Sequence, residues 1–122
     1  PTGRPLWSRD HGGAGGVAGS SGNVGVTDGK GTVYGLDKTS GAAMWSQQAL
    51  ARRSVTGPVI QGDYVVVGDY KGYLHWLRLS DGALVARQRG GRDRLIGQPV
   101  VAEGVLLVQN VDGKLAAYRL AN

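Results

Sequence analysis

The chain has no cysteine and no phenylalanine among its 122 residues. Without cysteine, this segment cannot form a disulfide bond, perform thiol chemistry or bind a metal through sulfur, and it fits an oxidising or a reducing compartment. Without phenylalanine, and with 22 glycines, the packing must rely on valine, leucine, tryptophan and tyrosine. The sequence therefore predicts a modest hydrophobic core.

Long apolar runs are also missing. No stretch approaches the ~18–20 consecutive apolar residues of a membrane-spanning helix. No segment keeps a helical period, so long helices are not expected. No secretory leader is visible, but the chain starts inside a repeat motif, so this says nothing about export.

The net charge is moderate and positive. The formal net charge of +5 permits an acidic protein, nucleic acid or lipid headgroups as partners, but net charge alone carries no specificity. The simplest interpretation is a solvated surface on one part of a larger, more balanced molecule. We expect no nucleic-acid partner.

What the chain does have is an internal repeat of 41 residues. Glycines, leucines and prolines recur at that interval: Gly31, Gly72 and Gly113; Leu36, Leu77 and Tyr118; Gly41 and Gly82; Pro58 and Pro99. A period near forty with strand-like segments is typical of a β-propeller, in which each repeat is one blade of four antiparallel strands. Three units are too few to close a ring, so we expect the chain to be part of a larger protein.

Strand-like segments fill the later units. Runs rich in β-branched and aromatic residues, separated by Gly and Asp turns, predict strands at 56–60, 64–68, 73–79 and 83–88, and again at 98–101, 105–108 and 115–118. The Gly-rich stretch 12–25 of the first unit should hold the least well packed strands. The fold class is therefore predicted to be all-β, with about three propeller blades.

The repeat also predicts blade boundaries. Residues 3–7 match 41–45 as Gly-x-x-x-Trp, so 1–10 should be the outer strand of a preceding blade. Residues 11–50 and 51–91 should each form a blade, and 92–122 a last blade without its outer strand. Because propellers often complete that blade with a strand from the distant N-terminus, we expect Asn122 to lie near a natural C-terminus and Pro1 to be a cut or a limit of order.

One unit shows a motif with clear physical roles. Residues 31–45 contain a strand, Asp37, a Ser-Gly turn and Trp45. The glycine allows the tight turn, the carboxylate can accept turn N–H groups, and the tryptophan can cover the neighbouring blade. The motif resembles the repeat of quinoprotein-type propellers; a WD repeat is set aside because Trp7 and Trp45 are followed by Ser.

The repeat motif is structural and incomplete. We assign its positions to Gly31, Asp37, Gly41, Trp45, Gly72, Trp76, Gly82 and Gly113. In the second unit, Arg78 stands where the motif expects an acid and Ala86 where it expects tryptophan, and both departures weaken the generic pattern.

A more specific resemblance lies in the second and third units. Residues 68–76 (Gly-Asp-Tyr-Lys-Gly-Tyr-Leu-His-Trp), 80–86, 98–102 and 112–115 are similar to the BamB family, the propeller lipoproteins of the outer-membrane β-barrel assembly machinery. The resemblance implies an eight-bladed ring at the periplasmic face of the outer membrane, with a lipid anchor outside this chain. It also implies a non-enzymatic scaffold that binds a periplasmic domain of BamA and aids barrel assembly, with unfolded outer-membrane proteins as further partners. The family's principal BamA-contacting positions lie in earlier blades, so none is carried over.

Candidate catalytic and metal sites are weak. His11 and His75 are the two histidines, and without cysteine or a His-x-x-x-His spacing they do not predict a metal site. His75 alternates with Leu74 and Trp76, so we expect it to pack or form a hydrogen bond at a blade interface. The 13–18 stretch resembles a dinucleotide-binding loop, but no helix follows it. We predict no catalytic residue, cofactor or metal.

The carboxylates and the basic residues are predicted to differ in role. Asp28, Asp69 and Asp112 recur near equivalent turns, which favours turn formation over paired acid–base chemistry. Basic residues occupy equivalent between-blade loops, on the face expected to carry Lys30 and Lys71: Arg52, Arg53, Arg92 and Arg94. They predict a basic rim that binds an acidic partner, the alternative being a solvated face.

Two other functions remain open from the sequence. The chain could belong to the propeller of a quinone-dependent dehydrogenase, although no calcium-ligating acid and amide with a catalytic Asp stand out here. It could also belong to a periplasmic propeller that senses a small ligand or glycan.

Overall fold

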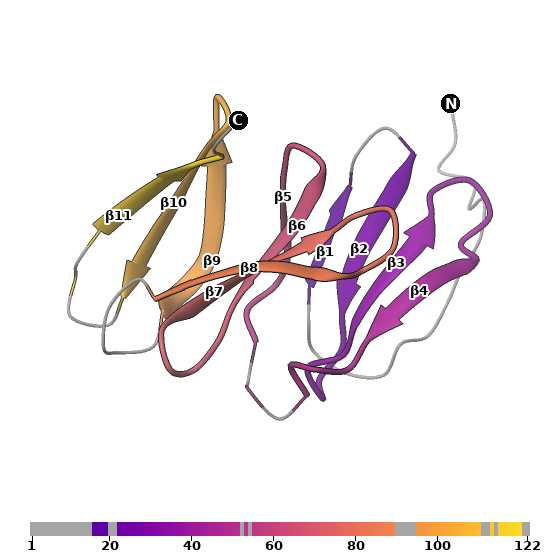
Figure 1. Ribbon diagram of the computed structural model, residues 1–122, viewed down its shortest axis with the longest axis horizontal. Helices are drawn as coiled ribbons and strands as arrows, with labels where there is room; N and C mark the ends of the chain where they lie inside the picture. Colours follow the sequence, from indigo (N-terminus) through magenta and orange to yellow (C-terminus); the bar gives the residue numbers. More distant parts are fainter. Residues whose placement is uncertain are drawn as a thin grey trace, which may run out of the picture.

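The computed structural model describes residues 16–19, 22–51, 53, 55–89, 95–110, 113 and 115–120. The backbone of these residues forms three separate antiparallel sheets that stand side by side (Figure 1). The strands are β1 (Gly16–Gly19), β2 (Asn23–Thr27), β3 (Val33–Asp37), β4 (Ala43–Gln47), β5 (Val59–Gln61), β6 (Tyr64–Gly68), β7 (Tyr73–Arg78), β8 (Leu84–Arg89), β9 (Leu95–Ala102), β10 (Val105–Asn110) and β11 (Leu115–Arg119). In this part of the chain no helix is long and apolar enough to span a membrane.

Each sheet is a meander in chain order. The first runs β1-β2-β3-β4, the second β5-β6-β7-β8, and the third pairs β9, β10 and β11. We call them blade one, blade two and blade three. This confirms the predicted all-β fold with four-stranded propeller blades. The predicted outer strand at 1–10 lies outside the described residues.

The predicted strands differ from the observed ones mainly at their ends. The strand expected at 56–60 begins only at Val59, because Thr56 instead caps β6: its backbone N–H donates to the Gly68 carbonyl, and its Oγ1 accepts the Gly68 N–H. The strand expected at 98–101 extends from Leu95 to Ala102. Its pairing with β10 is irregular between Leu107 and Gln109.

The middle strands of blade two, β6 and β7, are buried on both faces because the blade lies between the other two. Along β6 and β7 the buried side chains alternate, as the two-residue period of a strand requires. One set packs toward blade one with Val33 and Leu50: Val65, Val67, Leu77 and Leu79. The other packs toward blade three with Leu106 and Val108: Val66, Leu74 and Trp76. Burying each of these large side chains stabilises the fold by roughly 1.5–3 kcal/mol.

The glycines of the first unit permit close packing at two described positions. A Cβ on Gly16 would come within 2.7 Å of the Gly57 Cα, and one on Gly25 within 3.3 Å of the Val65 side chain. Strands β1 and β2 pair over four residues, from Gly16 with Thr27 to Gly19 with Val24. At these two positions the missing side chains let blade one approach blade two, whereas a Cβ on Gly19 would meet no atom within 4 Å. That the stretch holds the least well packed strands stays a prediction.

Candidate functional site

Two aspartates organise equivalent turns between the second and third strands of their blades. Asp28 Oδ1 accepts the backbone N–H groups of Lys30 and Thr32, at 2.9 and 3.0 Å. One period later, Asp69 Oδ1 accepts those of Lys71 and Tyr73, at 2.9 and 3.1 Å. The predicted turn role is confirmed for both. Asp112 lies outside the described residues.

The second oxygen of each aspartate has different partners in the two blades. In blade one, the Tyr34 hydroxyl donates to Asp28 Oδ2 at 3.2 Å. In blade two, Asp69 Oδ2 lies 2.8 Å from His75 Nε2 and 2.9 Å from an Arg53 guanidinium nitrogen. His75 is buried at 3% exposure, which confirms that it packs and forms a hydrogen bond.

The charge states of this cluster follow from burial and hydrogen bonding. Burial alone would raise the pKa of Asp69, but hydrogen bonds from His75, Arg53 and two backbone N–H groups together hold that pKa below its ordinary value. Burial lowers the pKa of His75, and this outweighs the opposing effect of Asp69. The lowered pKa favours the neutral form of His75. In that form Nε2 carries the proton, because an ionised carboxylate only accepts.

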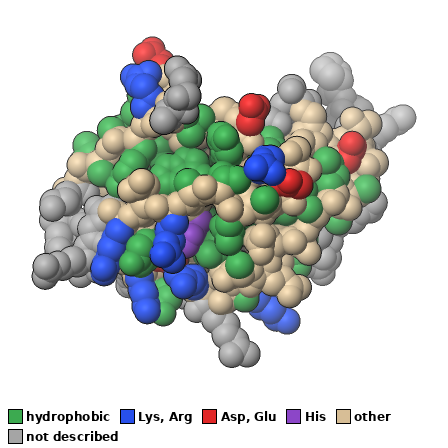
Figure 2. Space-filling view, in the orientation of Figure 1, with side chains coloured by type: hydrophobic (Ala, Val, Ile, Leu, Met, Phe, Trp, Pro, Cys, Tyr) green, Lys and Arg blue, Asp and Glu red, His purple; other side chains and the backbone are tan. Residues whose placement is uncertain are grey.

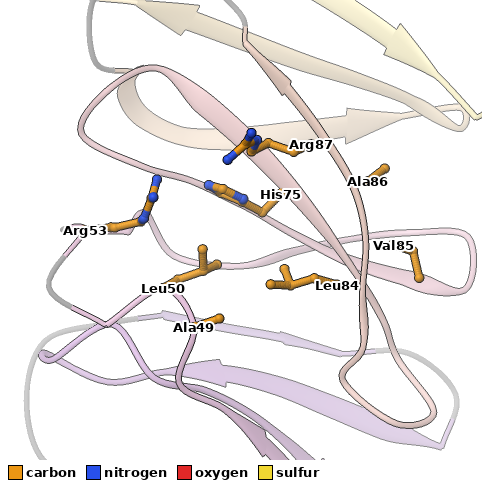
Figure 3. Close-up of a pocket in the computed structure, with 8 residues that line it drawn as sticks. All are labelled: Ala49, Leu50, Arg53, His75, Leu84, Val85, Ala86 and Arg87. Atoms are coloured by element: carbon orange, nitrogen blue, oxygen red, sulfur yellow. The ribbon is translucent and has the colours of Figure 1, made fainter.

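A cavity of about 390 Å³ opens beside this cluster, where blade two meets the loop that follows blade one. Its lining is apolar at one end and cationic at the other: Ala49, Leu50, Arg53, His75, Leu84, Val85, Ala86 and Arg87. Figure 3 shows the guanidinium groups of Arg53 and Arg87 turned toward the His75 ring. The ring of Tyr73 supports Arg87 at 4.9 Å and Arg89 at 5.2 Å, distances typical of cation–π contacts.

The predicted basic rim is only partly covered by the described residues. Arg53 lies among the described residues. Its guanidinium forms an ion pair with Asp69, and its side chain is 35% exposed. Arg52, Arg92 and Arg94 lie outside the described residues. Arg87 and Arg89 were not predicted as site residues. Arg87 lies in the strand predicted at 83–88 and Arg89 one residue beyond it, and the sequence did not reveal the register that sets Arg87 opposite His75.

The motif tryptophan of blade one reaches blade two. Trp45 Nε1 donates to the Leu79 carbonyl at 2.7 Å, and its ring lies against Gly82 and Gly35 so closely that a Cβ on either would collide with it. The prediction that Trp45 covers the neighbouring blade is confirmed. The structure also gives Gly82 a reason beyond its positive φ of 76°.

Blade two joins blade three with a tryptophan from a different strand. Trp76 Nε1 donates to Gln61 Oε1 at 2.8 Å, and Gln61 Nε2 donates to the carbonyls of Gly104 and Tyr118, both at 3.0 Å. The Trp76 ring meets Tyr118 edge-on, with centroids 5.8 Å apart. Buried amide and indole groups thus satisfy each other across the blade junction.

The two tryptophans occupy opposite members of one cross-strand pair. In blade one, Gly35 of β3 faces Trp45 of β4; in blade two, Trp76 of β7 faces Ala86 of β8. The large side chain of this pair therefore stands on the third strand in blade two and on the fourth strand in blade one. This accounts for the alanine at position 86, where the motif expects tryptophan.

The second departure is compensated in the same turn. Asp37 Oδ1 accepts the N–H groups of Thr39 and Ser40, as predicted. Arg78, at the equivalent position, instead forms an ion pair of 2.8 Å with Asp81, and Asp81 Oδ1 accepts the Ala83 N–H. The tight turns are confirmed at the motif glycines by positive φ angles: Gly31, Gly41, Gly72, Gly82 and Gly113.

Acidic and histidine side chains do not gather into a metal site in the described part of the chain, where no group of three or more could hold an ion. Among the described residues, the best candidate for a functional site is the cluster of Asp69, His75 and Arg53, together with the cavity beside it.

Three comparisons with known proteins, by family model, by sequence and by structure, all match proteins of one name. A family model described as "Outer membrane protein assembly factor BamB" matches residues 1–55 and 48–122. A protein of that name from Xanthomonas campestris pv. campestris is 71% identical over 99% of this chain. The crystal structure of BamB from Moraxella catarrhalis superposes with a TM-score of 0.79 at 25% identity, over 85% of this chain and 31% of that one.

The chain covers only part of the length of the proteins that it matches. The chain spans 30% of the length of the Xanthomonas protein. A quinohemoprotein alcohol dehydrogenase from Pseudomonas putida also superposes, with a TM-score of 0.68 over 82% of this chain and 18% of that one, but at 21% identity. That likeness shows the propeller fold alone.

Proposed function

This chain belongs to the family of outer membrane protein assembly factor BamB, and from that membership we propose that it is part of a non-enzymatic scaffold. The scaffold binds a periplasmic domain of BamA and aids the assembly and insertion of β-barrel outer-membrane proteins. The observation that carries the proposal is the 71% identity over 99% of the chain to a relative that is named an assembly factor. In the whole protein, the blades form an eight-bladed ring that a lipid anchor holds at the periplasmic face of the outer membrane.

The geometry is suited to a scaffold. Each junction between the described blades combines a packed apolar cluster with hydrogen bonds from a tryptophan indole. Such junctions fix neighbouring blades relative to each other, so the loops present their side chains on a rigid support. We propose that the basic rim of Arg52, Arg53, Arg92 and Arg94 contributes to binding an acidic partner. The dehydrogenase alternative gains no support from a likeness of fold alone.

A binding titration tests the proposal. The full-length protein is titrated with the soluble periplasmic domains of BamA, without any added cofactor, and saturable binding is expected. Folded full-length protein that fails to bind would contradict the scaffold function. Reversal of Arg52, Arg53, Arg92 and Arg94 to Glu tests the rim separately, and unchanged affinity at low salt would show that the rim is only solvated.

A further inference from the structure

The cations around His75 go beyond what the turn requires. Asp28 builds the same turn in blade one with Tyr34 as its side-chain partner. The positions one period before Arg87 and Arg89 hold Ser46 and Gln48, whereas Arg53 recurs one period later as Arg94. A structural need of the repeat would recur in both blades. Arg87 and Arg89 of β8 are therefore an addition to the turn.

Two arginines lie beside the single buried carboxylate of this cluster. Arg53 pairs with Asp69, which is buried, and Arg87 lies opposite His75 on the neighbouring strand and over the Tyr73 ring. Within the described part of the chain, Arg87 takes part in no ion pair. Figure 2 shows Lys and Arg side chains gathered around the histidine on this face. The cluster thus carries excess positive charge next to an open cavity.

The cavity combines this charge with apolar surface. Leu84 and Val85 of the outer strand are each 40% exposed, and they line the same 390 Å³ as Arg53 and Arg87. A guanidinium fork pairs with a carboxylate through two parallel hydrogen bonds. An adjacent apolar wall suits the aliphatic neighbours of that carboxylate and does not suit a flat layer of lipid headgroups.

We propose that this cavity binds an acidic peptide segment of a partner protein, with a carboxylate held by Arg53 and Arg87 and a neighbouring apolar side chain held against Leu84 and Val85. Arg89, beside Arg87 on the Tyr73 ring, adds long-range attraction. Asp69 positions Arg53 through their ion pair. The proposal does not depend on BamA as the partner.

The test uses the full-length protein and a short peptide of alternating leucine and aspartate that carries an uncharged dye. The matched peptide has asparagine in place of aspartate, and binding is followed by fluorescence anisotropy at low and high salt. We expect saturable, salt-sensitive binding of the aspartate peptide. Loss of one charge-assisted contact in Arg87→Gln should weaken it about tenfold, and Arg87→Gln/Arg89→Gln should weaken it further.

The control variant is Arg78→Gln, which removes an exposed arginine from the same sheet and should leave the affinity unchanged. Arg87 lies on a strand whose side chains are all exposed, so its variants should melt at the wild-type temperature. Equal binding of the asparagine peptide would overturn the proposal, as would equal losses in Arg78→Gln and Arg87→Gln. Binding to phosphatidylglycerol vesicles with no binding of the aspartate peptide would also overturn it, and would indicate a membrane surface instead.

Discussion

Blades one and two share a repeat, but they use different residues to contact the next blade and to bind the turn aspartate. Each must fix its neighbour, and blade one does so with Trp45 opposite Gly35 whereas blade two uses Trp76 opposite Ala86. Each must also hold a turn aspartate, which Tyr34 partners in one blade and His75 in the other. The difference teaches that the repeat conserves the cross-strand pair and the turn, while the strand that supplies the large side chain can change.

The largest expected effect is at the blade two–three junction. Trp76→Ala should lower the free energy of unfolding by about 3–5 kcal/mol, since it removes a buried ring and leaves Gln61 Oε1 without its donor. Urea unfolding of the full-length protein measures this. Trp76→Phe keeps most of the ring and should cost about 1–3 kcal/mol. Equal losses in both variants would show that the hydrogen bond dominates the contribution of the ring.

The equivalent change in blade one should have a smaller effect. Trp45 is only half-buried, so Trp45→Ala should cost about 2 kcal/mol, below the range for a fully buried ring. The same urea titration gives the value. A loss as large as that of Trp76→Ala would mean that the two junctions are energetically equivalent despite their different exposure.

The close approach of Trp45 to Gly82 can be tested by adding one methyl group. Gly82→Ala introduces a residue at φ 76° and a collision with the indole; Gly104→Ala, at φ 80°, meets no atom within 4 Å. The backbone strain should cost each variant about 1–2 kcal/mol. The collision should cost Gly82→Ala about 1–3 kcal/mol more. Equal melting temperatures of Gly82→Ala and Gly104→Ala would indicate that the Trp45 ring moves aside without a loss of stability.

The histidine of blade two should make its stability depend on pH. Burial lowers the pKa of His75 in the fold, so the unfolded chain binds more protons, and stability falls as the pH drops below the unfolded pKa of about 6.5. The lowered pKa of Asp69 adds a further loss below pH ~3.9. His75→Tyr reproduces the pairing of blade one and should abolish the first loss. Melting temperatures between pH 7 and pH 5 measure it, and an unchanged slope in the variant would assign it to another group.

The sequence predicted the fold well because the 41-residue period fixes glycine turns and strand spacing. It also predicted the roles of Asp37 and Trp45, which depend on local turn geometry and on a single large side chain. It did not reveal that Trp76 replaces the motif tryptophan, because the substitution crosses from one strand to its partner and depends on register. The cavity at Arg87 was not predicted for the same reason. The register between two strands decides which residues are cross-strand neighbours, and the residue pattern of one strand does not determine that register.

The tryptophan stands on opposite strands in the equivalent pairs Gly35–Trp45 and Trp76–Ala86, and this has an evolutionary consequence. A repeat that acquires a second tryptophan opposite the first would overfill the pair, and one that loses its tryptophan first would leave a void. Either single step passes through a destabilised ancestor. The two positions should therefore be inherited together, and divergence between duplicated blades should show them covarying across lineages as one large and one small residue.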